Sequence, residues 1–225
     1  MKFRFKTQQY QVDAVNAVVD VFKGQPHIGF EEYTRDLGVA KKNKIQVISM
    51  FDSDENTASI TDDNDDIGYS NASIKISDDI LLSNIKEVQS KSNLQESRHL
   101  INSLGTVSLD VEMETGTGKT YVYTRTIFEL NKRYGWSKFI VVVPSIAIRE
   151  GVHKSLEQTQ EHFMDLYGKK IRFFIYNSSN LGLIDQFSKD SSINVMIINI
   201  QAFNTRAADS RKIYETLDDF QSRRP

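Results

Sequence analysis

The chain has 225 residues, of which 39% are hydrophobic and 26% are charged, and its formal net charge is −2. These values fit a soluble globular protein with a substantial core, and they exclude a fibre and a surface that is basic throughout for binding nucleic acid or anionic lipid. The lack of cysteine excludes a disulfide framework and a thiolate metal site, and no apolar run approaches the roughly 20 residues that span a bilayer, so we expect a cytoplasmic protein that does not enter a membrane.

The N-terminal part of the chain predicts one helix, one strand and a polar insertion. Apolar residues at helical spacing, followed by a glycine and a proline, predict a helix over residues 8–23. The apolar stretch 45–51 predicts a strand. Residues 52–66 then contain seven carboxylates and no Lys or Arg, which is typical of a solvated loop, so we assign residues 52–77 to an acidic flexible insertion.

The rest of the chain predicts one more helix and then a regular alternation of strands and helices. Periodic apolar residues predict a helix over residues 80–104. Two of the helical stretches that follow end at a glycine, at Gly135 and Gly168. Four apolar runs alternate with the longer polar stretches: 107–113, 139–143, 171–176 and 195–200. This alternation indicates βαβ units, and therefore an α/β fold with a mainly parallel sheet and helices on both faces.

A glycine-rich segment lies between the first of these strands and the next helix: Glu114-Thr115-Gly116-Thr117-Gly118-Lys119-Thr120. The full phosphate-loop pattern begins with a glycine, where this chain has Met113. The preceding apolar strand, the two glycines and the following helix are nevertheless the structural context that this motif requires. Gly116 and Gly118 would bring backbone N–H groups close to a triphosphate. Lys119 would place its charge on the β and γ phosphates, as the catalytic residue, and the Thr120 hydroxyl would enter the shell of a magnesium ion. The segment predicts a site for ATP and magnesium; the alternative is a glycine-rich turn that caps a helix and leaves Lys119 exposed.

Several segments carry a family resemblance. METGTGKT (residues 113–120) resembles motif I of superfamily 2 helicases and translocases, in which the first glycine is often absent. In matching order, residues 8–14 are similar to the adenine-reading Q motif and residues 142–145 to motif Ia. At closer range the chain resembles the Res subunit of type III restriction enzymes, over nearly its whole length except the acidic insertion. The segments that carry this resemblance are FKTQQYQ (5–11), LDVEMETGTGKT (109–120), VPSIAIREGV (143–152) and NIQAFN (199–204).

The resemblance implies a RecA-like P-loop domain over residues 78–225, preceded by the insertion (52–77) and by an N-terminal helix and strand with the Q-like motif (1–51). It implies an ATP-dependent motor that translocates on double-stranded DNA as part of a restriction endonuclease, together with a modification (methyltransferase) subunit. The family's Asp-Glu motif, second motor domain and nuclease are not identifiable, so we expect a truncated chain that is inactive alone. The alternatives are another superfamily 2 motor and a non-catalytic nucleotide-dependent module that docks a protein.

Two segments that follow predicted strands are candidates for DNA contact. Pro144 and Ser145 stand between a strand and a helix, where a hydroxyl and free N–H groups would hold a phosphate, although Ser is also a common helix N-cap. Asn199 and Gln201 leave the last strand at its carboxyl end, the side where open α/β sheets bind ligands. Phe203 would stack on a base, but a lone aromatic residue is more often part of a core.

Other polar residues are candidates for binding adenine or a metal ion. The resemblance implies that Gln11 reads adenine, a role for which Gln8 and Gln9 compete. Residues 62–68 do not fit a calcium loop, because their glycine is out of register with the aspartates and no Glu closes the loop. The four histidines have no spacing suited to zinc, so we expect no structural metal.

Overall fold

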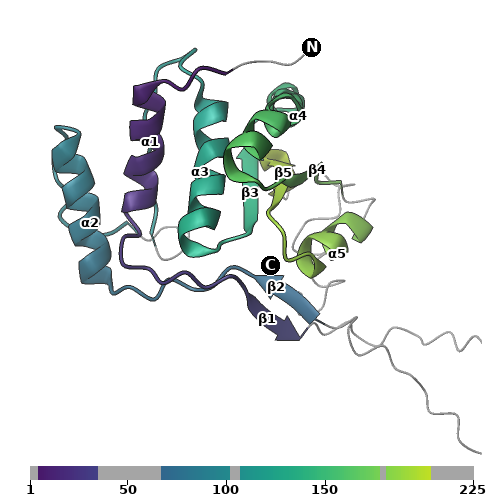
Figure 1. Ribbon diagram of the computed structural model, residues 1–225, viewed down its shortest axis with the longest axis horizontal. Coiled ribbons are helices and arrows are strands. Elements are labelled where there is room, and N and C mark those ends of the chain that lie inside the picture. The colour runs from purple at the N-terminus through teal and green to yellow at the C-terminus, as the bar shows by residue number, and fades with distance from the viewer. Residues whose placement is uncertain (1–4, 35–66, 102–106, 178–180, 204–225) are drawn as a thin grey trace, which may run out of the picture.

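Three parallel strands with helices on both faces form the centre of the protein, of which the computed structural model describes residues 5–34, 67–101, 107–177 and 181–203 (Figure 1). The predicted strand at 45–51, most of the acidic insertion and residues 204–225 lie outside these ranges. The elements in chain order are α1 (Gln9–Asp20), β1 (Glu31–Thr34), β2 (Ile67–Ser70), α2 (Asp78–Lys91), α3 (Lys119–Tyr134), β3 (Lys138–Val143), α4 (Ile146–Tyr167), β4 (Arg172–Ile175), α5 (Leu181–Lys189), β5 (Asn194–Asn199) and the 3-10 helix η2 (Ile200–Phe203).

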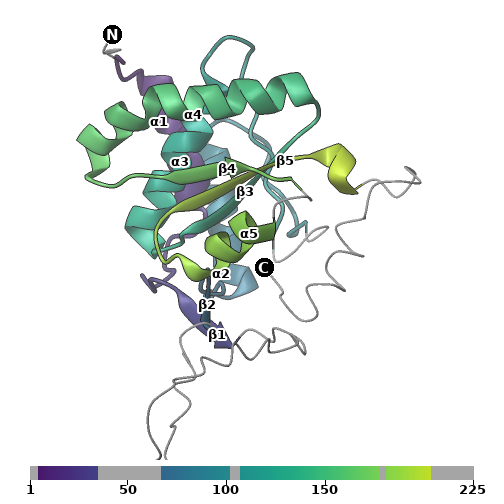
Figure 2. The same ribbon diagram turned by 90° about the vertical axis from the view of Figure 1, so that its right-hand side faces the viewer.

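The parallel sheet has the strand order β3-β5-β4. Successive side chains of a strand point to opposite faces of the sheet. In the central strand β5, Val195 and Ile197 alternate with Met196 and Ile198, so both faces of this strand are apolar. On one face Val195 and Phe173 pack against α3 and α4. On the other face Phe174 meets Phe187 of α5 edge to face, with ring centroids 6.0 Å apart. Figure 2 shows α4 and α5 on opposite sides of the sheet, so the predicted α/β fold with helices on both faces is confirmed.

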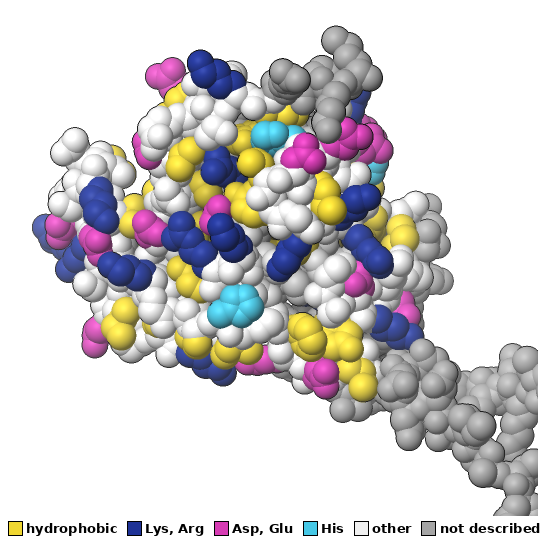
Figure 3. All heavy atoms as spheres, in the orientation of Figure 1, with side chains coloured by type: hydrophobic (Ala, Val, Ile, Leu, Met, Phe, Trp, Pro, Cys, Tyr) yellow, Lys and Arg dark blue, Asp and Glu magenta, His cyan; other side chains and the backbone are white. Residues whose placement is uncertain are grey.

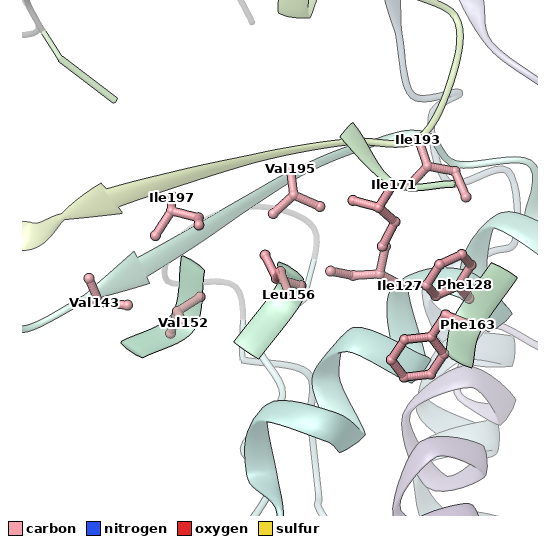
Figure 4. Packing of buried hydrophobic residues seen from close by; sticks show 10 residues of the cluster. All are labelled: Ile127, Phe128, Val143, Val152, Leu156, Phe163, Ile171, Ile193, Val195 and Ile197. Carbon is pink, nitrogen blue, oxygen red and sulfur yellow. The ribbon is translucent and has the colours of Figure 1, made fainter. Parts of the chain in front are cut away.

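The main core lies between the sheet and the helices α3 and α4. Figure 4 shows that strand side chains point toward those of the two helices. Burying each large apolar side chain contributes about 1.5–3 kcal/mol. The buried residues are Ile127, Phe128, Val143, Val152, Leu156, Phe163, Ile171, Ile193, Val195 and Ile197. This packing fixes α3, and with it the glycine-rich segment at its N-terminal end, to the sheet.

A second cluster joins α1 and α2 to the outer side of α3. Val19 and Leu81 are fully buried in it. The Tyr134 hydroxyl donates to the Val19 carbonyl at 2.8 Å, and Arg133 forms an ion pair with Asp20 at 2.6 Å. Helices α1 and α3 consequently lie side by side, as Figure 1 shows, so residues 9–20 share a core with the domain that was expected to begin at residue 78.

A short antiparallel ribbon, β1 and β2, is attached to the start of β3. The Asn71 side chain donates to the Lys138 carbonyl at 2.7 Å and accepts from the N–H groups of Ser137 and Lys138. Ala72 is buried beside it, and its carbonyl accepts from the Trp136 indole at 2.9 Å. Residues 67–77, which composition assigned to the flexible insertion, thus contain a strand and packed apolar side chains.

The structure corrects two predicted elements. The predicted strand 107–113 is wrong, because these residues do not form a strand. Strand β3 pairs with β5 on one edge, and no described strand pairs with the other edge of β3. The predicted helix 80–104 is too long. Helix α2 ends at Lys91, and Asn93 then adopts a left-handed conformation with φ 53°, which ends a helix and which Asn tolerates better than most residues. The predicted glycine ends of α3 and α4, at Gly135 and Gly168, are confirmed.

Candidate functional site

The glycine-rich segment forms a closed turn directly before α3. Gly116 and Gly118 both have left-handed backbone conformations, with φ 85° and 87°. The Thr117 hydroxyl donates to the Glu114 carbonyl at 2.7 Å and closes the turn. Left-handed conformations are strained for residues with a Cβ, so the two glycines are what this turn requires. The predicted phosphate loop therefore has a defined shape that the sequence pattern alone did not specify.

The N-terminus of α3 is open to an anion. The helix begins at Lys119, and its N-cap, Gly118, has no side chain that occupies the first N–H groups. No acidic residue stands in the first turn, and the positive end of the helix dipole is therefore not compensated there. A Cβ built on Gly116 meets no atom within 4 Å, so there is open space beside the loop. This arrangement fits a phosphate group.

Magnesium would be held together with the nucleotide rather than by the protein alone. Among the described residues no group of three or more His, Cys, Asp or Glu side chains is placed to hold a metal ion. Magnesium commonly keeps several waters and binds through phosphates and one or two protein ligands. Thr120, at the second position of α3, fits the role of such a ligand, and Lys119 is exposed beside it.

The first turn of α1 holds the loop from its other side. The Gln11 amide donates to the Thr117 carbonyl at 3.0 Å, and the Tyr10 hydroxyl donates to the same oxygen at 3.2 Å. Gln11 is 9% exposed, and no described residue donates to its Oε1, which leaves one acceptor free. Gln9 instead donates to Asp13, so of the competing glutamines the structure brings Gln11 to the loop. The contact of Tyr10 was missed, although it adjoins Gln11 in the Q-like motif.

Aromatic residues join the segment before α1 to both core helices. The Phe5 ring lies 4.9 Å from the His162 ring of α4 and 6.1 Å from the Tyr121 ring of α3, centroid to centroid. The Tyr121 oxygen and His162 Nε2 are 3.0 Å apart. Burial, and then the charge of Arg125, lower the pKa of His162, which favours its neutral form. Phe5, in the segment before Gln11, is thus fixed against the two helices.

The candidate DNA contacts meet at the carboxyl edge of the sheet, because β3 and β5 are paired and Val143 is in register with Asn199. Ser145 is the N-cap of α4, and its hydroxyl accepts from the Ile148 N–H at 3.3 Å. The Asn199 side chain is buried, and its oxygen accepts from the Gln201 N–H at 3.0 Å. Ser145 and Asn199 therefore have structural roles, while Pro144 and Gln201 are exposed.

The charges on the surface are mixed. In Figure 3 the Lys and Arg side chains on the face that carries α1, α2 and α3 are interspersed with Asp and Glu side chains. This distribution agrees with the net charge of −2 and restricts contact with nucleic acid on that face to local groups. In the described ranges no helix is both long and apolar enough to cross a membrane.

Comparison with known proteins gives a family match and three curated relatives. The family described as type III restriction enzyme, Res subunit, matches residues 4–221. The chain is 34% identical over 160 residues to the type III restriction-modification enzyme EcoP15I Res subunit of Escherichia coli and to the EcoPI Res subunit of Escherichia phage P1. These alignments cover 66% of this chain and 16% of each relative. The chain is also 36% identical over 126 residues, 48% of its length, to the StyLTI Res subunit of Salmonella typhimurium, of which 13% is covered.

Proposed function

The chain belongs to the Res subunit family of type III restriction enzymes, which has a helicase-like motor, and from this premise we propose that it binds ATP with magnesium at the turn before α3. In the whole enzyme, this part would drive ATP-dependent translocation on double-stranded DNA coupled to cleavage. The chain spans only 16% of the length of the EcoP15I and EcoPI Res subunits, so DNA cleavage and the modification subunit as partner belong to the proposal for the whole enzyme.

The observation that supports this proposal most directly is the uncapped N-terminus of α3 behind two left-handed glycines. Backbone N–H groups there would bind the phosphates, and Lys119 would place a positive charge against the terminal ones. Magnesium would neutralise the phosphate charge that develops during transfer. Gln11 would keep the loop in place through the Thr117 carbonyl and offer its Oε1 to the amino group of adenine.

The DNA-binding part of the proposal concerns the carboxyl edge of the sheet. The first N–H groups of α4 would bind a DNA phosphate next to Pro144 and Ser145, with Gln201 exposed nearby on the same edge. Binding of ATP between two motor domains would move this edge relative to the partner domain, and hydrolysis would release it. Nucleotide and DNA affinities would then depend on each other, which a docking module would not require.

The test is calorimetric titration of ATP with magnesium into the wild type and two lysine variants. Lys119→Ala should weaken binding about 10- to 100-fold, since a hydrogen bond to a charged group contributes about 1.5–3 kcal/mol. Lys132→Ala removes an exposed lysine at the opposite end of the same helix and should bind like the wild type. Equal affinity of Lys119→Ala and wild type would refute ATP binding at this loop. Repeating the titration with double-stranded DNA tests the coupling, and unchanged affinity would favour the docking alternative.

A further inference from the structure

Tyr123 has a buried hydroxyl that makes no hydrogen bond to any residue that the structure describes. It lies on α3, one turn after the phosphate loop, and solvent does not reach its oxygen. The other two tyrosines of this helix do have partners: Tyr121 meets His162 and Tyr134 donates to Val19. An unpartnered buried hydroxyl costs free energy, so its presence calls for a reason.

The helix geometry directs this hydroxyl toward Thr120. Residues three apart lie on the same face of a helix, and side chains lean toward the helix N-terminus, so Tyr123 extends back over the turn that contains Thr120. The Thr120 side chain is a neighbour of the Tyr123 hydroxyl, but the two do not form a hydrogen bond in this structure. The backbone of Thr120 is held too, because its carbonyl accepts a hydrogen bond from the Thr124 hydroxyl at 2.7 Å.

A threonine that binds magnesium must place its own proton elsewhere. The hydroxyl has one O–H donor and two lone pairs, and a lone pair points to the metal only when the proton points to another acceptor. We propose that Tyr123 is a positioning residue whose phenol oxygen accepts the proton of the Thr120 hydroxyl, so that a lone pair of Thr120 faces the magnesium ion bound with ATP. This inference rests on the proposed function. Partners behind a metal ligand commonly orient it in this way.

The test compares nucleotide affinity with and without the metal. ATP is titrated into the wild type, Tyr123→Phe and Tyr121→Phe, once with magnesium and once with a chelator. Tyr123→Phe should reduce the gain in affinity that magnesium gives by about 3- to 10-fold, as expected for one hydrogen bond, and leave the affinity with chelator unchanged. Tyr121→Phe removes a hydroxyl from the same helix that pairs with His162 instead, and should leave the magnesium gain unchanged.

Urea unfolding of the same variants checks for a merely structural role. Removing a buried hydroxyl that has no partner should leave the free energy of unfolding unchanged or raise it, so a loss of the magnesium gain in Tyr123→Phe would not be a folding defect. A magnesium gain equal to that of the wild type would overturn the role of Tyr123 while ATP binding stands. Failure of the wild type to bind ATP under either condition would overturn the proposed function, and this inference with it.

Discussion

The two glycines of the phosphate loop offer a matched pair of substitutions. Both have φ near +85°, so an alanine at either position is forced into a left-handed conformation at a cost of about 1–2 kcal/mol. Their surroundings differ. A Cβ at Gly116 meets nothing within 4 Å, whereas a Cβ at Gly118 would lie 2.7 Å from Gln11 Nε2. Gln11 must then move, and its hydrogen bond to the Thr117 carbonyl is lost.

The expected destabilisation follows from the backbone strain at both glycines and from the loss of the Gln11 hydrogen bond at Gly118. Gly116→Ala should lower the free energy of unfolding by about 1–2 kcal/mol, and Gly118→Ala by about 1 kcal/mol more, the contribution of one hydrogen bond. Urea unfolding measures both. In a Gln11→Ala background, where the obstructing amide is gone, the two glycine substitutions should cost the same. If Gly118→Ala costs no more than Gly116→Ala in the wild type, or if Gln11→Ala does not remove the difference, the contact between α1 and the loop does not hold as described.

Two further predictions concern the rest of the fold. Asn71→Ala removes three hydrogen bonds between the β1–β2 ribbon and the start of β3, and should lower the free energy of unfolding by about 2–4 kcal/mol; a loss below about 1 kcal/mol in urea unfolding would show that the ribbon is not held there. Burial, and then the Glu129 carboxylate, raise the pKa of Tyr167 to about 12, so between pH 10 and 12 the unfolded state loses this proton first and stability falls as pH rises. Tyr167→Phe should show a shallower fall over that window, and an identical slope in both proteins would contradict the shift.

Local signals predicted much of the fold. The helices before Gly135 and Gly168 and the parallel strands β3 to β5 follow from apolar periodicity and glycine ends, which are properties of neighbouring residues. The phosphate loop was recognisable for the same reason. Its contact with Gln11 was not predicted, because a hydrogen bond between residues so far apart in the chain depends on how α1 packs against α3. The family resemblance implied only that Gln11 reads adenine.

The wrong prediction of a strand at residues 107–113 shows the limit of periodicity and also bears on the site. Val107, Leu109 and Met113 do pack against the core beside α1 and α2, while Val111 is 49% exposed, so the apolar pattern indicates burial on one side. A strand further requires a neighbouring strand with which its backbone pairs, and no strand of the described residues pairs with this segment. The loop is therefore not approached from a paired strand. Its described hydrogen bonds to a distant part of the chain come from Tyr10 and Gln11, so its position should depend on α1, and the Gln11 background in the glycine experiment tests this dependence directly.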